Sequence, residues 1–581
     1  MNGSKEDCVS EEEFMFRRIA IAAICLAGVA FLSVSGSPLQ ESGYDLIIKG
    51  AKIVDGTGNP WFYGDIAIQG DTIAEIGNLS GKSAKAIIDA KGLVVAPGFI
   101  DVHTHCDFNI GKPDCKANLN YLSQGVTTVV TGNCGSGPLH VAETQALWEK
   151  QGIGTNAIIL MGFGTVRTAV MKVEPRDPTP EELEKMKSIL RQGLKEGAWG
   201  MSTGLEYIPD RYSKTGEVIA MTKVVGEFGG IYTSHMRDES AVICDAVKET
   251  IRIGEGTGVR ANIAHFKVCG KNNWGLMKQA IKLVQEARAR GIYVSADQYP
   301  YTKSAPFGPV WEIPVIPDKL EPLAGIHKKG RDLYRKHASE AELNKLKEQY
   351  VTELIKALQN KSKREEIKKM TLEGTADDPS PIAMWGWHNY TILVSRKNPQ
   401  LNEKNMSDLI QEQKRDGFEI LADLIVEEPD AFYSGGAMSE DEVREAMNQD
   451  WVMISSDGEA APIVKETDAP KTGHPRLFGS QSKILREYVR EDRVLTLENA
   501  VRKMTSLPAS FLRMKDRGLL LRGYKADLVI FNPETIKDNA TFVDSQKYCT
   551  GVEYVILNGR MSIEKGKFNN SLNGKVLLRQ E

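Results

Sequence analysis

The central part of the chain alternates short apolar runs with amphipathic stretches, and this alternation constrains the fold more than any other feature. Runs rich in β-branched residues, such as TTVVTG, NAIILMGFG and ANIAHFK, are separated by helical stretches such as PEELEKMKSILRQGLKEG. Strands that alternate with helices over such a length predict an α/β fold with a parallel sheet. Polar residues capable of chemistry cluster at the ends of many of these strands, which favours a (β/α)8 TIM-type barrel over an open sheet. We expect this barrel over residues 98–514.

Both ends of the chain are predicted to be rich in strands. Residues 45–99 and 518–570 contain short apolar runs split by Gly and Asp turns, for example DLIIKGAKIVDGTG and GVEYVILNGR. Two such ends around one αβ centre predict a small sheet domain built from both termini. We place this domain at residues 41–97 and 515–581.

A charged helical stretch over residues 318–372 interrupts the centre. It contains i,i+4 charge pairs and few candidate core residues. We expect an inserted subdomain or lid over residues 303–380. Ordinary barrel helices with long solvated faces are the alternative.

The N-terminal region contains one targeting signal. Residues 19–36 form an uninterrupted uncharged run, which Arg17 and Arg18 precede and small residues end. This pattern predicts a secretory signal peptide, although 18 residues could also just span a bilayer as an anchor. We therefore expect residues 1–40 to be a signal peptide or membrane anchor plus linker. The protein would be exported to the periplasm or secreted. The sequence leaves open whether the segment is cleaved and whether Met15 is the true start.

Composition excludes several classes of function. The 581 residues carry 73 basic and 77 acidic side chains, and no block of Lys or Arg forms a stripe that could follow phosphates. Nucleic-acid binding is therefore not expected. The eight cysteines are widely spread without a CxxC pair, which argues against a disulfide scaffold.

The first motif that carries chemistry is GFIDVHTHCD, residues 98–107. His103 and His105 follow an apolar strand and are two residues apart. Alternation along a strand places both imidazoles on one face. Two adjacent imidazoles are a typical beginning of a metal site.

Further candidates end other strand-like runs. Cys134 of TTVVTGNCGSG could be a thiolate ligand of zinc or a small buried apolar residue. His235 ends IYTSHM, and His265 ends ANIAHF; Lys267 should face the same side as His265 and could bind a substrate carboxylate. Asp457 of WVMISSDG is a candidate general base beside a metal, or else a helix N-cap.

These segments together resemble the amidohydrolase superfamily, in particular its D-aminoacylase (N-acyl-D-amino-acid deacylase) branch. The resemblance runs from about Tyr44 to Arg579 and depends on GFIDVHTHCD, GNCGSG, STGLEYIP, SHMRDES, IAHFK, DQYPY, SSDG, GHPR and KADLVIF, in this order. It implies a (β/α)8 barrel with a small β-sandwich from both chain ends. No lysine is a clear candidate for the carboxylated bridge of other amidohydrolases, and GNCG fits the cysteine-bridged branch.

The resemblance also implies roles for individual residues. A tight zinc site would use Cys134, His235 and His265, and a second, weaker site would use His103 and His105 with Cys134 as the bridge. Asp457 would be the catalytic acid and base. The residues implied to hold the substrate near its carboxylate are Tyr207, Lys267 and Tyr299, with Arg476 of GHPR as a further carboxylate partner. After GHPR the chain reads LFGSQSKIL, where the family commonly continues toward an aromatic-Pro-Arg segment, so the neighbouring substrate contacts should differ.

The activity implied is zinc-dependent hydrolysis of small N-acyl-D-amino acids to a D-amino acid and a carboxylate, with no stable protein partner. The alternatives are hydrolysis of a cyclic amide such as a hydantoin or dihydropyrimidine, hydrolysis of a dipeptide, and a non-catalytic scaffold. A disulfide between Cys134 and Cys106 or Cys115 would exclude Cys134 as a zinc ligand.

Overall fold

The structure is a computed structural model that describes residues 43–304, 310, 313–335, 340–374, 380, 382–383, 386–465, 468 and 471–579. The predicted signal or anchor segment, residues 1–40, lies outside the described residues. Within the described ranges, no helix combines the length and apolarity needed to cross a bilayer.

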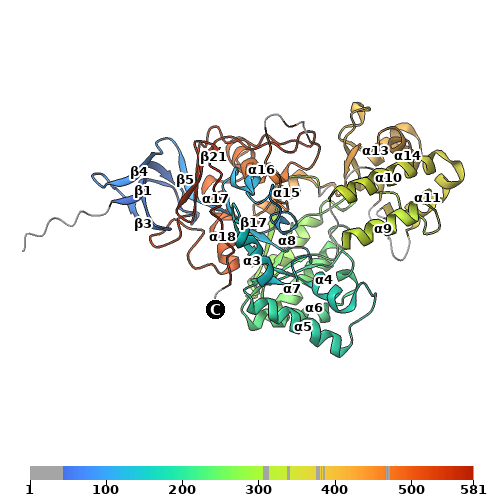
Figure 1. Ribbon diagram of the computed structural model, residues 1–581, viewed down its shortest axis with the longest axis horizontal. Coiled ribbons are helices and arrows are strands. Elements are labelled where there is room, and N and C mark those ends of the chain that lie inside the picture. The colour runs from blue at the N-terminus through green and yellow to red at the C-terminus, as the bar shows by residue number, and fades with distance from the viewer. Residues whose placement is uncertain are drawn as a thin grey trace, which may run out of the picture.

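Strands from both chain ends form one nine-stranded sheet at one end of the molecule (Figure 1). The N-terminal strands are β1 (Tyr44–Ile53), β2 (Phe62–Gln69), β3 (Thr72–Gly77), β4 (Ala84–Asp89) and β5 (Val94–Pro97), and the C-terminal ones are β18 (Leu528–Phe531), β19 (Val552–Leu557), β20 (Arg560–Glu564) and β21 (Lys567–Phe568). Strand β5 joins the two groups, because it pairs in parallel with β1 and antiparallel with β18. Apolar residues of both groups, among them Ile53, Ile66 and Ile530, share one core.

Two parallel sheets form the centre. One has the order β6 (Phe99–Asp101), β7 (Val126–Thr131), β8 (Asn156–Ile159), and the other the order β17 (Val452–Ile454), β13 (Val294–Gln298), β12 (Arg260–Ile263), β11 (Ile231–His235), β10 (Gly200–Gly204), β9 (Met161–Gly162). Only Leu160 separates β8 from β9, and at the other margin Thr104 forms a parallel bridge with Gly458. Nearly all residues of these strands are buried, as in parallel sheets that are covered on both faces.

Amphipathic helices connect the central strands, which confirms the predicted alternation. They include α5 (Pro180–Lys195), α6 (Thr215–Glu227), α7 (Ile243–Thr257) and α8 (Leu276–Ala289). Helix α5 begins with a capping box, in which the Thr179 hydroxyl accepts from the backbone N–H of Glu182 and the Glu182 carboxylate accepts from that of Thr179. Its buried residues lie on one face, so burial of that face fixes the helix against the strands.

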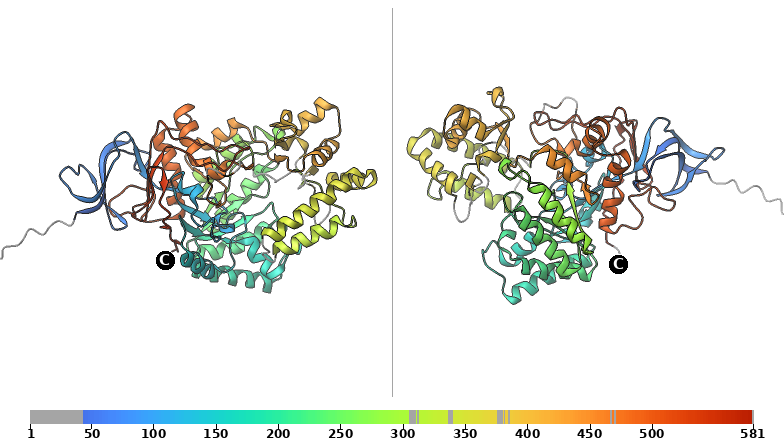
Figure 2. Two further views of the ribbon diagram at one scale, coloured as in Figure 1. Left: turned by 45° about the horizontal axis from the view of Figure 1, so that its top comes forward. Right: turned by 180° about the vertical axis from the view of Figure 1, so that it is seen from behind.

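Helices project from the side of the molecule opposite the nine-stranded sheet, as both views of Figure 2 show. They are α9 (Leu323–Arg335), α10 (Glu340–Gln359), α11 (Lys361–Glu373), α13 (Met406–Gln413) and α14 (Gly417–Glu427), and the antiparallel strands β14 (Thr391–Val394), β15 (Lys404–Asn405) and β16 (Phe432–Ser434) pack with them. Buried residues from Val310 to Tyr433 form a separate apolar core here. This core therefore continues beyond residue 380, because β14, β16, α13 and α14 contribute to it.

Candidate metal centre and substrate pocket

The predicted ligands lie at the carboxyl ends of different central strands. The two histidines of the first motif follow β6, Cys134 follows β7, His235 is the last residue of β11, His265 follows β12, and Asp457 follows β17. Since parallel strands end at a common edge, residues far apart in the sequence meet there.

Cys134, His235 and His265 form the first group of metal-ligand atoms. The Cys134 Sγ lies 3.9 Å from the His235 Nδ1 and 3.7 Å from the His265 Nε2, and the two nitrogens are 2.9 Å apart. A tetrahedral zinc with Zn–S of about 2.3 Å and Zn–N of about 2.0–2.1 Å separates its ligand atoms by roughly 3.3–3.6 Å. The three atoms are within a few tenths of an ångström of this arrangement, and one thiolate with two imidazoles is a donor set that suits zinc.

A second group shares Cys134 with the first. The Cys134 Sγ lies 3.4 Å from the His103 Nε2, and ligand atoms of His103, His105 and Cys134 all lie within 4.8 Å of one another. The Asp457 Oδ1 lies 3.4 Å from the His103 Nε2 and 3.2 Å from the His105 Nε2. Cys134 is therefore placed to bridge two positions, with the Asp457 carboxylate beside the second.

In three of the histidines one ring nitrogen faces the other metal-ligand atoms, and the second ring nitrogen contacts a carboxylate. The pairs are His235 Nε2 with Glu206 at 2.9 Å, His265 Nδ1 with Glu239 at 2.7 Å and His103 Nδ1 with Asp297 at 3.2 Å. Such contacts fix the orientation of a metal-binding imidazole and raise its basicity. Our sequence reasoning missed all three carboxylates, although each lies in a motif quoted for the family resemblance: STGLEYIP, SHMRDES and DQYPY.

Charged neighbours shift the pKa values of the metal-ligand residues. Burial disfavours the Cys134 thiolate, but the neighbouring imidazoles, first His103 and then His105 and His235, together lower the pKa of this thiol well below its ordinary value. Burial likewise disfavours the charged form of His235, yet Glu239 and Cys134 raise its pKa to about 10. A metal cation would be stabilised by the same negative charges of Glu239 and Cys134 that raise this pKa.

The backbone is strained at three of the converging residues. Cys134, His265 and Asp457 have positive φ angles of 52°, 35° and 51°. Residues other than glycine rarely adopt this conformation, and it costs of order 1–3 kcal/mol for each residue. The hydrogen bonds of the surrounding strands must therefore hold these three residues in this backbone conformation.

Asp457 is held as a carboxylate by Arg476. The Arg476 Nη1 donates to the Asp457 Oδ2 at 2.7 Å, and both side chains are buried. Burial raises the pKa of Asp457, but Arg476 and then His103 lower it, so the pKa lies well below its ordinary value. The guanidinium that sequence reasoning assigned to a substrate carboxylate thus contacts the candidate acid and base, and a role in substrate binding stays a prediction.

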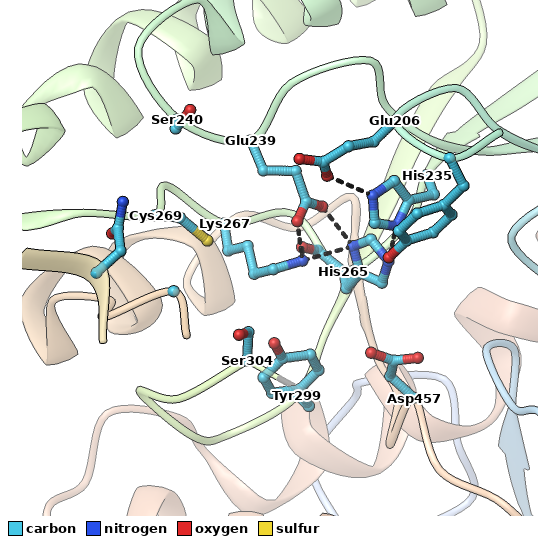
Figure 3. Close-up of a pocket in the computed structure, with 13 residues that line it drawn as sticks. Glu206, His235, Glu239, Ser240, His265, Lys267, Cys269, Tyr299, Ser304 and Asp457 are labelled. Carbon is cyan, nitrogen blue, oxygen red and sulfur yellow. Dashed lines mark hydrogen bonds and ion pairs between the residues drawn. The ribbon is translucent and has the colours of Figure 1, made fainter. Parts of the chain in front are cut away.

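A pocket of about 130 Å³ opens beside His235 and His265 (Figure 3). Tyr207, Lys267 and Tyr299, which the sequence resemblance assigned to the substrate, line it. The Lys267 Nζ lies 2.5 Å from the Glu239 Oε2. The buried Tyr299 hydroxyl has no hydrogen-bond partner among the described residues, so it can donate to a ligand.

The carboxylates Glu206, Glu239 and Asp457 also line the pocket on the side of the metal centre, and the rest of its wall is uncharged and partly comes from the projecting helical region. It includes Ser240, Cys269, Ser304, Asn389 and Gly436. Asn389 belongs to a segment that packs with α13 and β15, so this region reaches the pocket. A substrate group away from the metal centre would meet neutral atoms here.

None of the six cysteines among the described residues, Cys106, Cys115 and Cys134 included, forms a disulfide. The alternative of a disulfide at Cys134 is therefore wrong for this structure. Packing explains it, because the Cys106 thiol lies against Asn118 and the Cys134 thiol faces the imidazoles instead.

A family model described as the amidohydrolase family matches residues 86–291 and 388–563, more than half of the chain. The chain belongs to the amidohydrolase family. A D-aminoacylase of Alcaligenes xylosoxydans xylosoxydans is 31% identical to this amidohydrolase, over 94% of the chain and 99% of the relative.

Two solved structures extend the comparison. A crystal structure of a D-aminoacylase has a TM-score of 0.69 and 29% identity, over 92% of this chain and all of the other. An N-acyl-D-glutamate deacylase from Bordetella bronchiseptica, crystallised with zinc and a phosphonate mimic of the tetrahedral intermediate, has a TM-score of 0.67 and the same identity and coverage. The resemblance read from the motifs is thus confirmed, and the amidohydrolase has an α/β fold like that of D-aminoacylase.

Proposed function

We propose that this amidohydrolase uses zinc to hydrolyse the amide bond of N-acyl-D-amino acids, releasing a D-amino acid and a carboxylate. One observation carries the proposal: the Cys134 thiol and the His235 and His265 imidazoles converge at zinc-ligand spacing, with the Asp457 carboxylate nearby. The relatives named D-aminoacylase and N-acyl-D-glutamate deacylase support the choice of substrate, because they match almost the whole chain.

Cys134, His235 and His265 would hold the tightly bound zinc, and His103 and His105 would complete a second, weaker position that Cys134 bridges. Zinc held there would supply Lewis-acid chemistry, which polarises a carbonyl and makes water acidic enough to attack at neutral pH. The mutual spacing of the donors and the carboxylates behind the imidazoles support this assignment.

Asp457 performs the proton transfers in this proposal. Because Arg476 keeps the carboxylate ionised, Asp457 can accept the proton of the attacking water and deliver it to the departing nitrogen. His103 and His105 lie 3.4 and 3.2 Å from the same carboxylate oxygen and would orient it. The amide C–N bond breaks when the nitrogen receives this proton.

Lys267 and Tyr299 would bind the substrate carboxylate. Burial disfavours the Lys267 ammonium, but Glu239 raises the pKa of this amine above its ordinary value, so the side chain stays cationic. The Tyr299 hydroxyl supplies a donor in the same wall, and the Tyr207 ring packs against the His235 ring at 4.3 Å. A carboxylate anchored by Lys267 would leave the acyl group near the metal ligands.

We further propose how the parts of the chain are arranged around this site. The central strands would close an eight-stranded barrel, since β8 continues into β9 and Thr104 bridges to Gly458; its members are β6, β7, β8 with β9, β10, β11, β12, β13 and β17. The nine-stranded sheet would fold into a β-sandwich, and the helical region that begins near residue 303 would act as a lid on the pocket. Export directed by residues 1–40 belongs to the same proposal.

The experiment is an activity screen of purified protein with zinc added and removed. We expect release of free D-methionine from N-acetyl-D-methionine, no release from the L-form, and loss of activity after chelation. Turnover of hydantoin or of a dipeptide without turnover of the D-acyl substrate would favour the rival hydrolases. Purified protein that binds no zinc would favour a non-catalytic scaffold.

A further inference from the structure

A buried carboxylate that the proposed chemistry does not use lies next to the metal centre. Asp101 is the last residue of β6 and is fully buried. Its Oδ1 accepts from the backbone N–H of His103 at 3.1 Å and from that of Ser456 at 3.2 Å, and its Oδ2 accepts from the Gln481 Nε2 at 2.9 Å. One carboxylate thus binds the segment that carries His103 and the segment that carries Asp457.

Helix α16 (Arg476–Lys483) connects the same two segments by a second route. Its first residue, Arg476, donates to the Asp457 carboxylate at 2.7 Å, and Gln481 donates to Asp101. The backbone N–H of Gln481 also donates to the Gln124 Oε1 at 3.1 Å, which ties the helix to the chain before β7. The positions of the two carboxylates are therefore coupled through one short helix.

We propose that Asp101 is a positioning residue, which with Gln481 fixes the separation between the His103 imidazole and the Asp457 carboxylate. The inference rests on the proposed function, because that function gives Asp457 its task. A carboxylate suits this place, since three N–H donors converge on it and both of its oxygens only accept.

The consequence concerns the rate more than the binding of zinc or substrate. Cys134, His235 and His265 lie at the ends of other strands, β7, β11 and β12, so a shift of the Ser456–Asp457 turn leaves the tight zinc group intact. Displacement of a reacting group by about 1 Å can lower a rate by about 100-fold. We therefore expect a loss in kcat, with little change in KM and in bound zinc.

Three variants test this coupling. Gln481→Glu places a second carboxylate against Asp101, where the present contact is 2.9 Å, and should lower kcat by about 10- to 100-fold. Asp101→Asn should cost less than about 10-fold, because the Gln481 Oε1 has no partner among the described residues and the Gln481 amide can turn to accept. The double variant should recover most of the loss of Gln481→Glu, since the new glutamate accepts from the new amide.

Amide hydrogen exchange supplies a readout that does not depend on turnover. The N–H groups of His103 and Ser456 donate to Asp101, so peptides over residues 101–106 and 452–460 should exchange faster in Gln481→Glu and slow again in the double variant. Asp527→Asn is the matched control. Asp527 is also buried and accepts from the Asn558 N–H at 2.6 Å and the Asn156 Nδ2 at 3.2 Å, but at the amino ends of the strands.

The control should lower the melting temperature without changing kcat or exchange over residues 452–460. The inference is overturned if Gln481→Glu behaves like the control, or if the double variant shows no recovery in either readout. A wild-type protein that hydrolyses no N-acyl-D-amino acid would instead refute the proposed function, and the exchange data alone would then decide whether Asp101 holds the two segments.

Discussion

Replacement of Arg476 by methionine tests how the Asp457 carboxylate is kept ready to accept a proton. The Arg476 Nη1 and the Asp457 Oδ2 are 2.7 Å apart, and each side chain is 8% exposed. Two charges about 4 Å apart at an effective dielectric constant of about 20 attract by about 4 kcal/mol, which corresponds to about 3 pKa units. Water that enters after the substitution weakens this effect, so we expect the pKa of Asp457 to rise by about 1–3 units.

The direction in which pH changes the activity follows from the protonation state of Asp457, because only the ionised carboxylate is active. Its pKa is depressed in the folded protein, so the carboxylate is ionised above that value and activity falls only as the pH drops through it. Arg476→Met raises this pKa, and the acid limb of kcat/KM should move up by about 1–3 pH units. Activity on the plateau at higher pH should stay near that of the wild type.

The assay is the pH profile of kcat and kcat/KM for an N-acetyl-D-amino acid, with Arg486→Met as control. Arg486 contacts Asp538 at 2.5 Å and does not line the pocket among the described residues, so its loss should leave the limb in place. An acid limb that does not move in Arg476→Met, together with a KM that rises at every pH, would refute the reasoning. That result would return Arg476 to the substrate-binding role expected from the sequence.

Three further outcomes are expected. Cys134→Ala removes a ligand that both metal groups share, so elemental analysis should find most of the zinc lost; stoichiometric zinc would contradict the site. Tyr299→Phe should raise KM by about 10-fold and leave the melting temperature equal or higher, because an unpartnered buried hydroxyl costs about 1–3 kcal/mol; a lower melting temperature with an unchanged KM would indicate a structural role. Phe418→Ala, in the separate core of residues 310–433, should destabilise that region by about 3–5 kcal/mol and produce an early unfolding transition in calorimetry, whereas a single cooperative shift would show that the region unfolds with the rest.

Local patterns in the sequence were sufficient to find the residues that converge. Each of His103, Cys134, His235 and His265 ends or follows an apolar run, and the end of a buried parallel strand has few positions from which a side chain can face the common edge. The alternation of runs and amphipathic stretches likewise predicted the central strands and helices. Both predictions depend on neighbouring residues only.

What the sequence did not reveal depends on contacts between distant segments. Glu206 meets His235, and Glu239 meets His265, through loops whose course no periodicity encodes. Arg476 was predicted near a carboxylate, but only the position of α16 decides that this carboxylate is Asp457. The strands β14 to β16 are two to four residues long, too short for an alternating pattern, so the core of the helical region could not be delimited.

The place of β5 between β1 and β18 also has a consequence for synthesis of the protein. About 430 residues separate Pro97 from Leu528, and at about 5–20 residues per second a ribosome needs roughly 20–90 s to make them. During this interval the edge of β5 that later pairs with β18 through Val94 and Val95 has no partner strand. Translation speed and chaperones that cover such an edge should therefore influence the yield of folded protein more than substitutions on its surface.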